Sequence, residues 1–269
     1  METASNMAKL TKDWGDNFTL LTPEEGVCSV VATSQGAPGG GKSHFWMTAP
    51  GPIAWFLFDP GGLKGLRNNP LFAKKEIHVS DYCGDLNIGK LDKDERMVRS
   101  IAAMERFQSD WDIAVRNART LVVDKESMLW EMVRYAHDEV ASPQPKNFHE
   151  LNLLYRGWIQ DAEVNGRNLG LIRDVHDTWG KIGVSSTTGK PQMGFTGDMK
   201  PDGQKYATSL VQVNLSHRWN ADEETFETEI LEKCRLGSAK KLIGKVVADL
   251  DFPTLGMMLF PNSDVSDWE

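Results

Sequence analysis

The sequence predicts an α/β fold with a mainly parallel central sheet flanked by helices. Short, β-branched apolar runs recur along the chain, amphipathic segments separate them, and two of the runs end in an aspartate. Continuously apolar strands indicate a parallel sheet, because helices then cover both of its faces. Alternating segments toward the carboxyl terminus predict antiparallel strands at that edge of the sheet.

The expected elements follow from these patterns in chain order. The expected strands are short and apolar or alternating, and they span 27–33, 53–59, 76–82, 120–124, 168–175, 209–218 and 225–236. The expected helices have apolar positions three or four residues apart, and they span 93–116, 127–140 and 148–165. The polar stretch 180–206 is too long for a simple connection, so it is either a functional loop or a hairpin.

Composition and segment character set the domain organisation. We expect an N-terminal arm over 1–26, one domain over 27–248, and an acidic tail over 249–269 with the apolar centre LGMMLF. A net charge of −8 excludes a uniformly basic nucleic-acid coat but not a local basic patch. The three cysteines show no CxxC spacing, and no apolar run is long enough to span a membrane, so a cytoplasmic protein without a membrane partner is expected.

A glycine-rich loop follows the first expected strand and precedes an expected helix start. The eight residues Gly36, Ala37, Pro38, Gly39, Gly40, Gly41, Lys42 and Ser43 match G-x-x-x-x-G-K-[ST]. Backbone N–H groups of such a loop surround phosphate oxygens, the lysine contacts the β- and γ-phosphates, and the serine hydroxyl is a ligand of Mg²⁺. The sequence therefore predicts a site for ATP and Mg²⁺.

Acids at strand ends are the candidates for the remaining chemistry. Asp124 closes the apolar run LVVD and is expected to help Ser43 hold Mg²⁺. Hydrolysis also needs a group that orients the attacking water, and the candidates are Asp59 and Glu126. His176 is a candidate sensor of the γ-phosphate, with a structural hydrogen bond as the alternative.

The order of these motifs resembles the RecA-like P-loop ATPases of phages related to single-strand annealing recombinases. The resemblance covers 27–245 and rests on GAPGGGKS, WFLFDPGG, LVVD, LIRDVH, TGDMKPDGQKYATSLVQVNL and ILEKCRLG. It implies a RecA-like NTP-hydrolysing domain that assembles as a ring or filament. In that family a glutamate two residues after the aspartate of the second strand activates water, whereas this chain has Gly61 there. Lys233 and Arg235 match a pair that reaches the γ-phosphate of a neighbouring subunit; the alternative is two solvated residues.

Basic and aromatic residues alternate in the segment where RecA-like proteins carry DNA-binding loops. Cations attract phosphates and aromatic rings stack on bases, so single-stranded DNA is the expected ligand. The candidate DNA-binding residues are Lys190, Phe195, Lys200, Lys205 and Tyr206. A polar loop or a hairpin that makes subunit contacts is the alternative.

The expected function is Mg²⁺-dependent ATP hydrolysis on single-stranded DNA in phage recombination, annealing or replication. The expected setting is the cytoplasm of an infected bacterium, with phage or host recombination and replication proteins as partners. The alternatives are a nucleotide-gated DNA-binding adaptor with little hydrolysis, a DNA-packaging or AAA+ loader motor, and a nucleotide kinase. A kinase needs an arginine-rich lid over the phosphates, and the sequence has no such cluster.

Overall fold

The computed structural model describes residues 28–85, 91–137, 148–184, 191–232 and 234–269. Within these residues a nine-stranded sheet has the order β3-β2-β4-β5-β1-β7-β8-β9, and β6 pairs with β5 outside this path. Neighbouring strands from β3 to β7 are parallel, and the β7–β8 and β8–β9 pairs are antiparallel. The predicted fold class, a mainly parallel sheet with antiparallel strands at the C-terminal edge, is therefore confirmed.

The strands are short except at the β5–β6 hairpin. Their bounds are β1 Val31–Gly36, β2 Ile53–Leu57, β3 Ile77–Asp81, β4 Thr120–Asp124, β5 Asn168–Val184, β6 Pro191–Pro201, β7 Val213–Asn220, β8 Thr225–Ile230 and β9 Val246–Ala248. Along β4, Leu121 and Val123 pack in one hydrophobic cluster and Val122 in another. The two clusters lie on opposite faces because successive side chains of a strand point to opposite sides.

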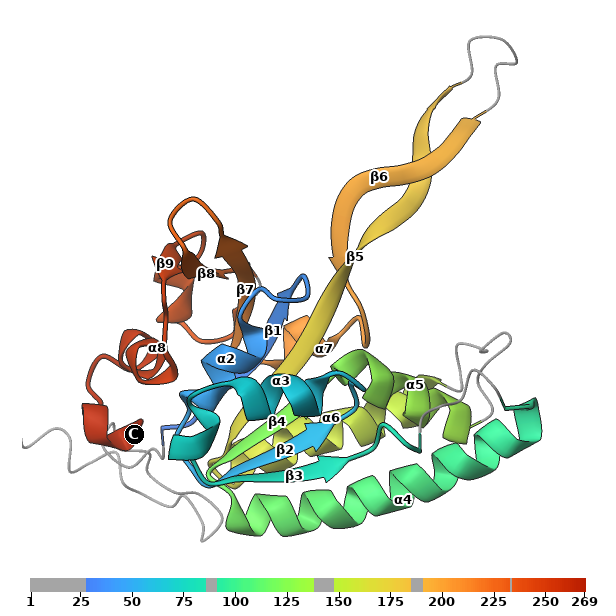
Figure 1. The fold of residues 1–269 in the computed structure, drawn as a ribbon, viewed down its shortest axis with the longest axis horizontal. Coiled ribbons are helices and arrows are strands. Elements are labelled where there is room, and N and C mark those ends of the chain that lie inside the picture. The colour runs from blue at the N-terminus through green and yellow to red at the C-terminus, as the bar shows by residue number, and fades with distance from the viewer. Residues whose placement is uncertain (1–27, 86–90, 138–147, 185–190, 233) are drawn as a thin grey trace, which may run out of the picture.

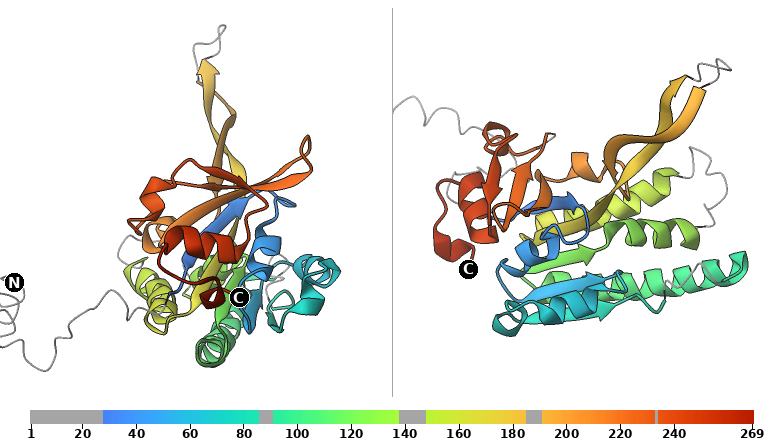
Figure 2. Two further views of the ribbon diagram at one scale, coloured as in Figure 1. Left: turned by 90° about the vertical axis from the view of Figure 1, so that its left-hand side faces the viewer. Right: turned by 45° about the horizontal axis from the view of Figure 1, so that its top comes forward.

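Helices cover both faces of the sheet (Figures 1 and 2). One cluster contains side chains of α4 Lys93–Asn117, α5 Glu126–Ala136 and α6 Phe148–Val164. The other contains side chains of α2 Lys42–Met47, α3 Gly62–Asn68 and α8 Phe252–Leu259. A one-turn helix, α7 Ala207–Leu210, precedes β7, and 3-10 turns span Phe72–Lys74, Ala239–Lys241 and Val265–Asp267. The core therefore consists of two layers, one on each side of the sheet.

Several strand bounds differ from the sequence expectation. β8 was expected over 225–236 and ends at Ile230, and β2 and β3 are one or two residues shorter than expected. β1 begins at Val31 rather than at residue 27, because its pairing with β5 starts at the Val31–Leu169 register. β7 begins at Val213, since residues 207–210 form α7 instead of the start of the strand. β5 continues to Val184 because it pairs with β6 beyond the sheet.

The segment expected as either a functional loop or a hairpin is a hairpin. β5 and β6 pair antiparallel from Val175–Pro201 to Val184–Pro191. Figure 1 shows this hairpin, here called the arm, projecting away from the helices and the rest of the sheet. The carboxyl edge of the parallel sheet is the edge at which the parallel strands end. The arm begins where β5 continues past this edge, so its base adjoins the loop that follows β1.

Residues 249–269 pack against the helix that follows the glycine-rich loop. Phe252 and Trp268 are fully buried. The Phe252 ring lies 5.4 Å from the Trp46 ring of α2. Trp268 packs on Gly256, where a Cβ atom would lie 2.3 Å from the indole. The apolar centre of this acidic segment is thus part of the core. In the described part of the chain, no helix has the length and apolar character needed to cross a membrane.

Candidate functional site

The glycine-rich loop connects β1 to α2 at the carboxyl edge of the sheet. It lies against the backbone of β7: a Cβ atom on Gly36 would come within 2.2 Å of the His217 carbonyl oxygen. Gly41 has a φ of 95° and faces the Phe226 ring, which a Cβ atom would approach to 2.6 Å. Both positions therefore require glycine, so the motif spacing also reflects the close packing of the loop on β7 and β8.

Lys42 points back into the loop. Its ammonium group donates to the carbonyl oxygens of Gly36 at 2.7 Å and Ala37 at 2.9 Å, and it lies 3.1 Å from a carboxylate oxygen of Asp174. The residue is 7% exposed. An ammonium has three N–H donors, so these acceptors account for all of them.

Ser43 and Asp124 come together although 81 positions separate them in the sequence. The Ser43 hydroxyl donates to Oδ2 of Asp124 at 3.2 Å. Burial, and then the charge of Asp59, raises the pKa of Asp124 to about 6, so the carboxylate is largely ionised at neutral pH. A hydroxyl and a carboxylate oxygen at this spacing are ligands that Mg²⁺ prefers, and the residues present fit that ion.

The two candidates for orienting water have different surroundings. Asp59 follows β2, is half-buried, and accepts a hydrogen bond from the Gly61 backbone at 3.3 Å. Glu126 is fully buried, and its carboxylate accepts hydrogen bonds from the Tyr155 hydroxyl at 2.7 Å and the Gln204 backbone at 3.1 Å. Access to solvent therefore favours Asp59 as the group that contacts water.

The Glu126 carboxylate belongs to a buried polar network under the arm. Arg173 of β5, itself 1% exposed, lies 3.1 Å from Oε2 of Glu126. The same guanidinium donates to the carbonyl oxygens of Asp202 at 2.7 Å and Gln204 at 3.1 Å. Burial raises the pKa of Glu126, while the Arg173 charge opposes that rise. The network fixes the segment after β6 to the start of α5 and to the part of β5 that lies in the parallel sheet.

His176 and the candidate DNA-binding residues lie on the arm and at its base. The His176 ring lies against the Asp202 carboxylate, and the His176 backbone pairs with Lys200. Phe195 and Lys200 are exposed on β6, and Lys205 and Tyr206 are exposed just after it. Lys190 lies outside the described residues.

Arg235 lies near the amino edge of the sheet, where the parallel strands begin, whereas the glycine-rich loop lies at the carboxyl edge. Its backbone N–H donates to the Gln212 carbonyl, and the Gln212 N–H donates to the carbonyl of Val31, the first residue of β1. β1 has six residues, so at about 3.3 Å per residue roughly 20 Å separates the two edges. Arg235 therefore does not reach the loop of its own chain. Lys233 lies outside the described residues.

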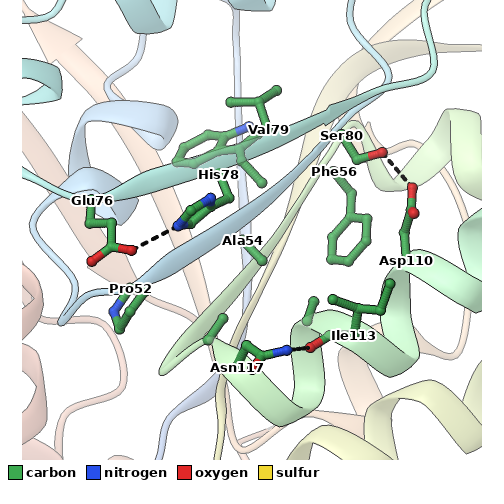
Figure 3. A pocket seen from close by; sticks show the side chains of 13 residues that line it. Pro52, Ala54, Phe56, Glu76, His78, Val79, Ser80, Asp110, Ile113 and Asn117 are labelled. Atoms are coloured by element: carbon green, nitrogen blue, oxygen red, sulfur yellow. Dashed lines mark hydrogen bonds and ion pairs between the residues drawn. The ribbon is translucent and has the colours of Figure 1, made fainter.

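A separate cavity of about 370 Å³ lies between β2, β3 and α4, toward the amino ends of the strands (Figure 3). Four of its polar side chains form two pairs, and the Asn117 side chain donates to the Ile113 carbonyl. Glu76 lies 2.8 Å from His78, and the Ser80 hydroxyl donates to Asp110 at 2.6 Å. None of the predicted site residues lines this cavity.

Comparison with known proteins finds a likeness only in structure. No family model matches the sequence, and no curated protein matches it. A solved structure titled "Crystal structure of the RadB recombinase" superposes with a TM-score of 0.44 and 12% sequence identity. The match covers 81% of this chain and 86% of that chain. A likeness this distant assigns neither a ligand nor an activity to the chain.

The sequence pattern did not single out two charged residues of the site. Asp174 ends the parallel part of β5, and Lys125 follows Asp124 directly. Lys125 lies 2.6 Å from Oδ2 of Asp174, whose other oxygen faces Lys42. Both residues lie where an apolar run reaches the carboxyl edge of the parallel sheet, which is the signal that could have identified them, since strand ends meet at one edge of a parallel sheet.

Proposed function

We propose that the chain binds ATP with Mg²⁺ and hydrolyses it, acting on single-stranded DNA in phage recombination, annealing or replication. The observation that carries the proposal is the meeting of Lys42, Ser43 and Asp124 at the carboxyl edge of the sheet. In this proposal residues 36–41 surround the phosphates and Lys42 contacts the β- and γ-phosphates. Ser43 and Asp124 hold Mg²⁺, which neutralises charge that develops on the phosphate oxygens.

Asp59 is the proposed water-orienting group, and Glu126 takes a positioning role through Arg173. The half-buried carboxylate of Asp59 and the full burial of Glu126 support this division. His176, which lies on the arm, remains the proposed γ-phosphate sensor, and its ring contacts Asp202 just after β6.

A nucleotide-gated DNA-binding adaptor is the second candidate. Gly61 stands where the resembled family has a glutamate, and the residue is exposed. Asp59 is then the one solvent-accessible acid of the two candidates that could orient water. If it does so poorly, hydrolysis is slow, and bound ATP acts as a ligand that controls DNA binding.

The arm is the proposed DNA-binding element. Lys233 and Arg235 are proposed to contact the γ-phosphate that is bound by a neighbouring subunit. Exposed aromatic and basic side chains on the arm support stacking on bases and attraction of phosphates. The distance of Arg235 from its own loop supports a role in a neighbouring copy, which implies a ring or filament.

Steady-state ATP hydrolysis with and without single-stranded DNA tests the proposal, with the mass in solution recorded under each condition. Stimulation by DNA together with assembly would support the DNA-dependent ATPase. ATP binding without turnover under both conditions would support the adaptor instead. Unchanged turnover in Lys42→Ala would overturn the site assignment.

A further inference from the structure

Asp174 lies between two lysines at the centre of the carboxyl edge. Its Oδ1 is 3.1 Å from the Lys42 ammonium and its Oδ2 is 2.6 Å from the Lys125 ammonium. β5 runs between β1 and β4, and Asp174 is in register with Gly36. The carboxylate is therefore beside the start of the glycine-rich loop. Lys42 reaches it from the start of α2, and Lys125 reaches it from directly after β4.

The carboxylate occupies a position suited to a phosphate group. Carboxylate and phosphate oxygens both accept short, charge-assisted hydrogen bonds from ammonium groups. The other two donors of Lys42 are held by carbonyl oxygens of the loop itself, at 2.7 Å and 2.9 Å. If the loop keeps its contacts, Lys42 can contact a phosphate only after its ion pair with Asp174 breaks.

We propose that Lys125 is a second phosphate-binding lysine of this site, and that Asp174 is an internal anion that holds both lysines until the terminal phosphate displaces it. The inference rests on the proposed nucleotide function. Lys125 has a side chain that is 30% exposed, so it remains accessible from the solvent side of the edge. The two lysines then flank the terminal phosphate of a nucleoside triphosphate, which a diphosphate lacks.

This arrangement makes Lys125 a determinant of triphosphate over diphosphate binding. Loss of a hydrogen bond to a charged group costs about 1.5–3 kcal/mol, which corresponds to roughly a 10- to 150-fold change in affinity. A purely structural Lys125–Asp174 ion pair would instead change the stability of the chain and leave the ratio of the two affinities unaltered.

The test measures Kd values for Mg²⁺–ADP and for a non-hydrolysable ATP analogue by calorimetry on the full chain. We expect Lys125→Met to weaken analogue binding at least 10-fold while the Kd for ADP changes less than two-fold. Lys125→Arg keeps the charge and should retain most of the preference. Lys240→Met, which removes an exposed lysine of the 3-10 turn Ala239–Lys241, is the matched control and should change neither Kd.

Asp174→Asn provides an independent measurement from the other side of the pair. It removes the competing charge, so analogue affinity should rise several-fold relative to ADP affinity. An unchanged ratio in both Lys125→Met and Asp174→Asn, with wild-type binding of both ligands intact, would overturn the inference and leave the nucleotide site standing. If Lys125→Met does not fold, an unchanged ratio in Asp174→Asn alone overturns it. Failure of the wild-type chain to bind either ligand would overturn the proposed function and the inference together.

Discussion

The buried His217 makes the stability of this fold sensitive to acid. Its two ring nitrogens lie 3.0 Å from the Ser34 hydroxyl and 3.0 Å from the Thr228 hydroxyl, and its carbonyl supports the glycine-rich loop. Burial, and then the charge of Lys42, lowers the pKa of this histidine from 6.5 to about 3. The ring is therefore neutral in the folded chain and becomes protonated after unfolding as the pH falls below 6.5.

The size of the effect follows from proton linkage. Because the unfolded state binds more protons, the free energy of unfolding decreases as the pH falls from 6.5 toward 3. With these two pKa values, the contribution of His217 between pH 7 and pH 5 is a loss of about 2 kcal/mol. The figure changes little for any folded-state pKa below about 4, because at pH 5 the folded ring is then still mostly neutral.

Urea unfolding of the wild-type chain and of His217→Gln at pH 7 and pH 5 measures this contribution. Asp124, Glu126 and the other acids titrate in both proteins, so the difference between the two pH dependences isolates the histidine. We expect the variant to lose about 2 kcal/mol less than the wild type over this range. Equal losses in the two proteins would show that His217 does not titrate as the buried geometry requires.

Four further substitutions test other parts of the structure. Glu126→Ala leaves Arg173 buried without its anion, so urea unfolding should show a destabilisation of about 3–5 kcal/mol; a loss below about 1 kcal/mol would contradict the buried pair. Asp124→Asn should abolish Mg²⁺-dependent turnover while nucleotide still binds, and a steady-state assay showing full turnover would remove Asp124 from the metal site. Arg235→Ala should keep ATP binding but reduce turnover, and unaltered turnover would exclude a role in a neighbouring copy. Replacing Lys200 and Lys205 together should weaken single-stranded DNA binding and flatten its salt dependence, and an unaltered slope of affinity against salt would return the arm to a structural role.

Local pattern was sufficient to predict the fold class and the elements that carry the loop. β4 has the predicted bounds because a short apolar, β-branched run between a helix and a turn is typical of a strand that is buried on both faces of a parallel sheet. The start of β1 was predicted too early because residues 27–30 are as apolar as those that follow. Pairing with β5, more than a hundred residues away, decides where the strand begins.

The polar contacts of the site depend on long-range packing that the sequence does not display. Glu126 was a candidate for orienting water because it follows Asp124 by two positions. Its burial results from Tyr155 on α6 and Arg173 on β5, which approach it only in the folded chain. The Lys125–Asp174 contact likewise depends on β5 lying between β1 and β4.

The position of Arg235 bears on the symmetry of any assembly. Arg235 can contact the glycine-rich loop of a neighbouring copy if the copies stack. The amino edge of one sheet then lies on the carboxyl edge of the next. Such a contact joins two different surfaces, so every added copy exposes a fresh site for another. An open filament built this way has a direction, and the copy at one end has a site that no neighbour completes. Closure into a ring fixes the number of copies and completes every site.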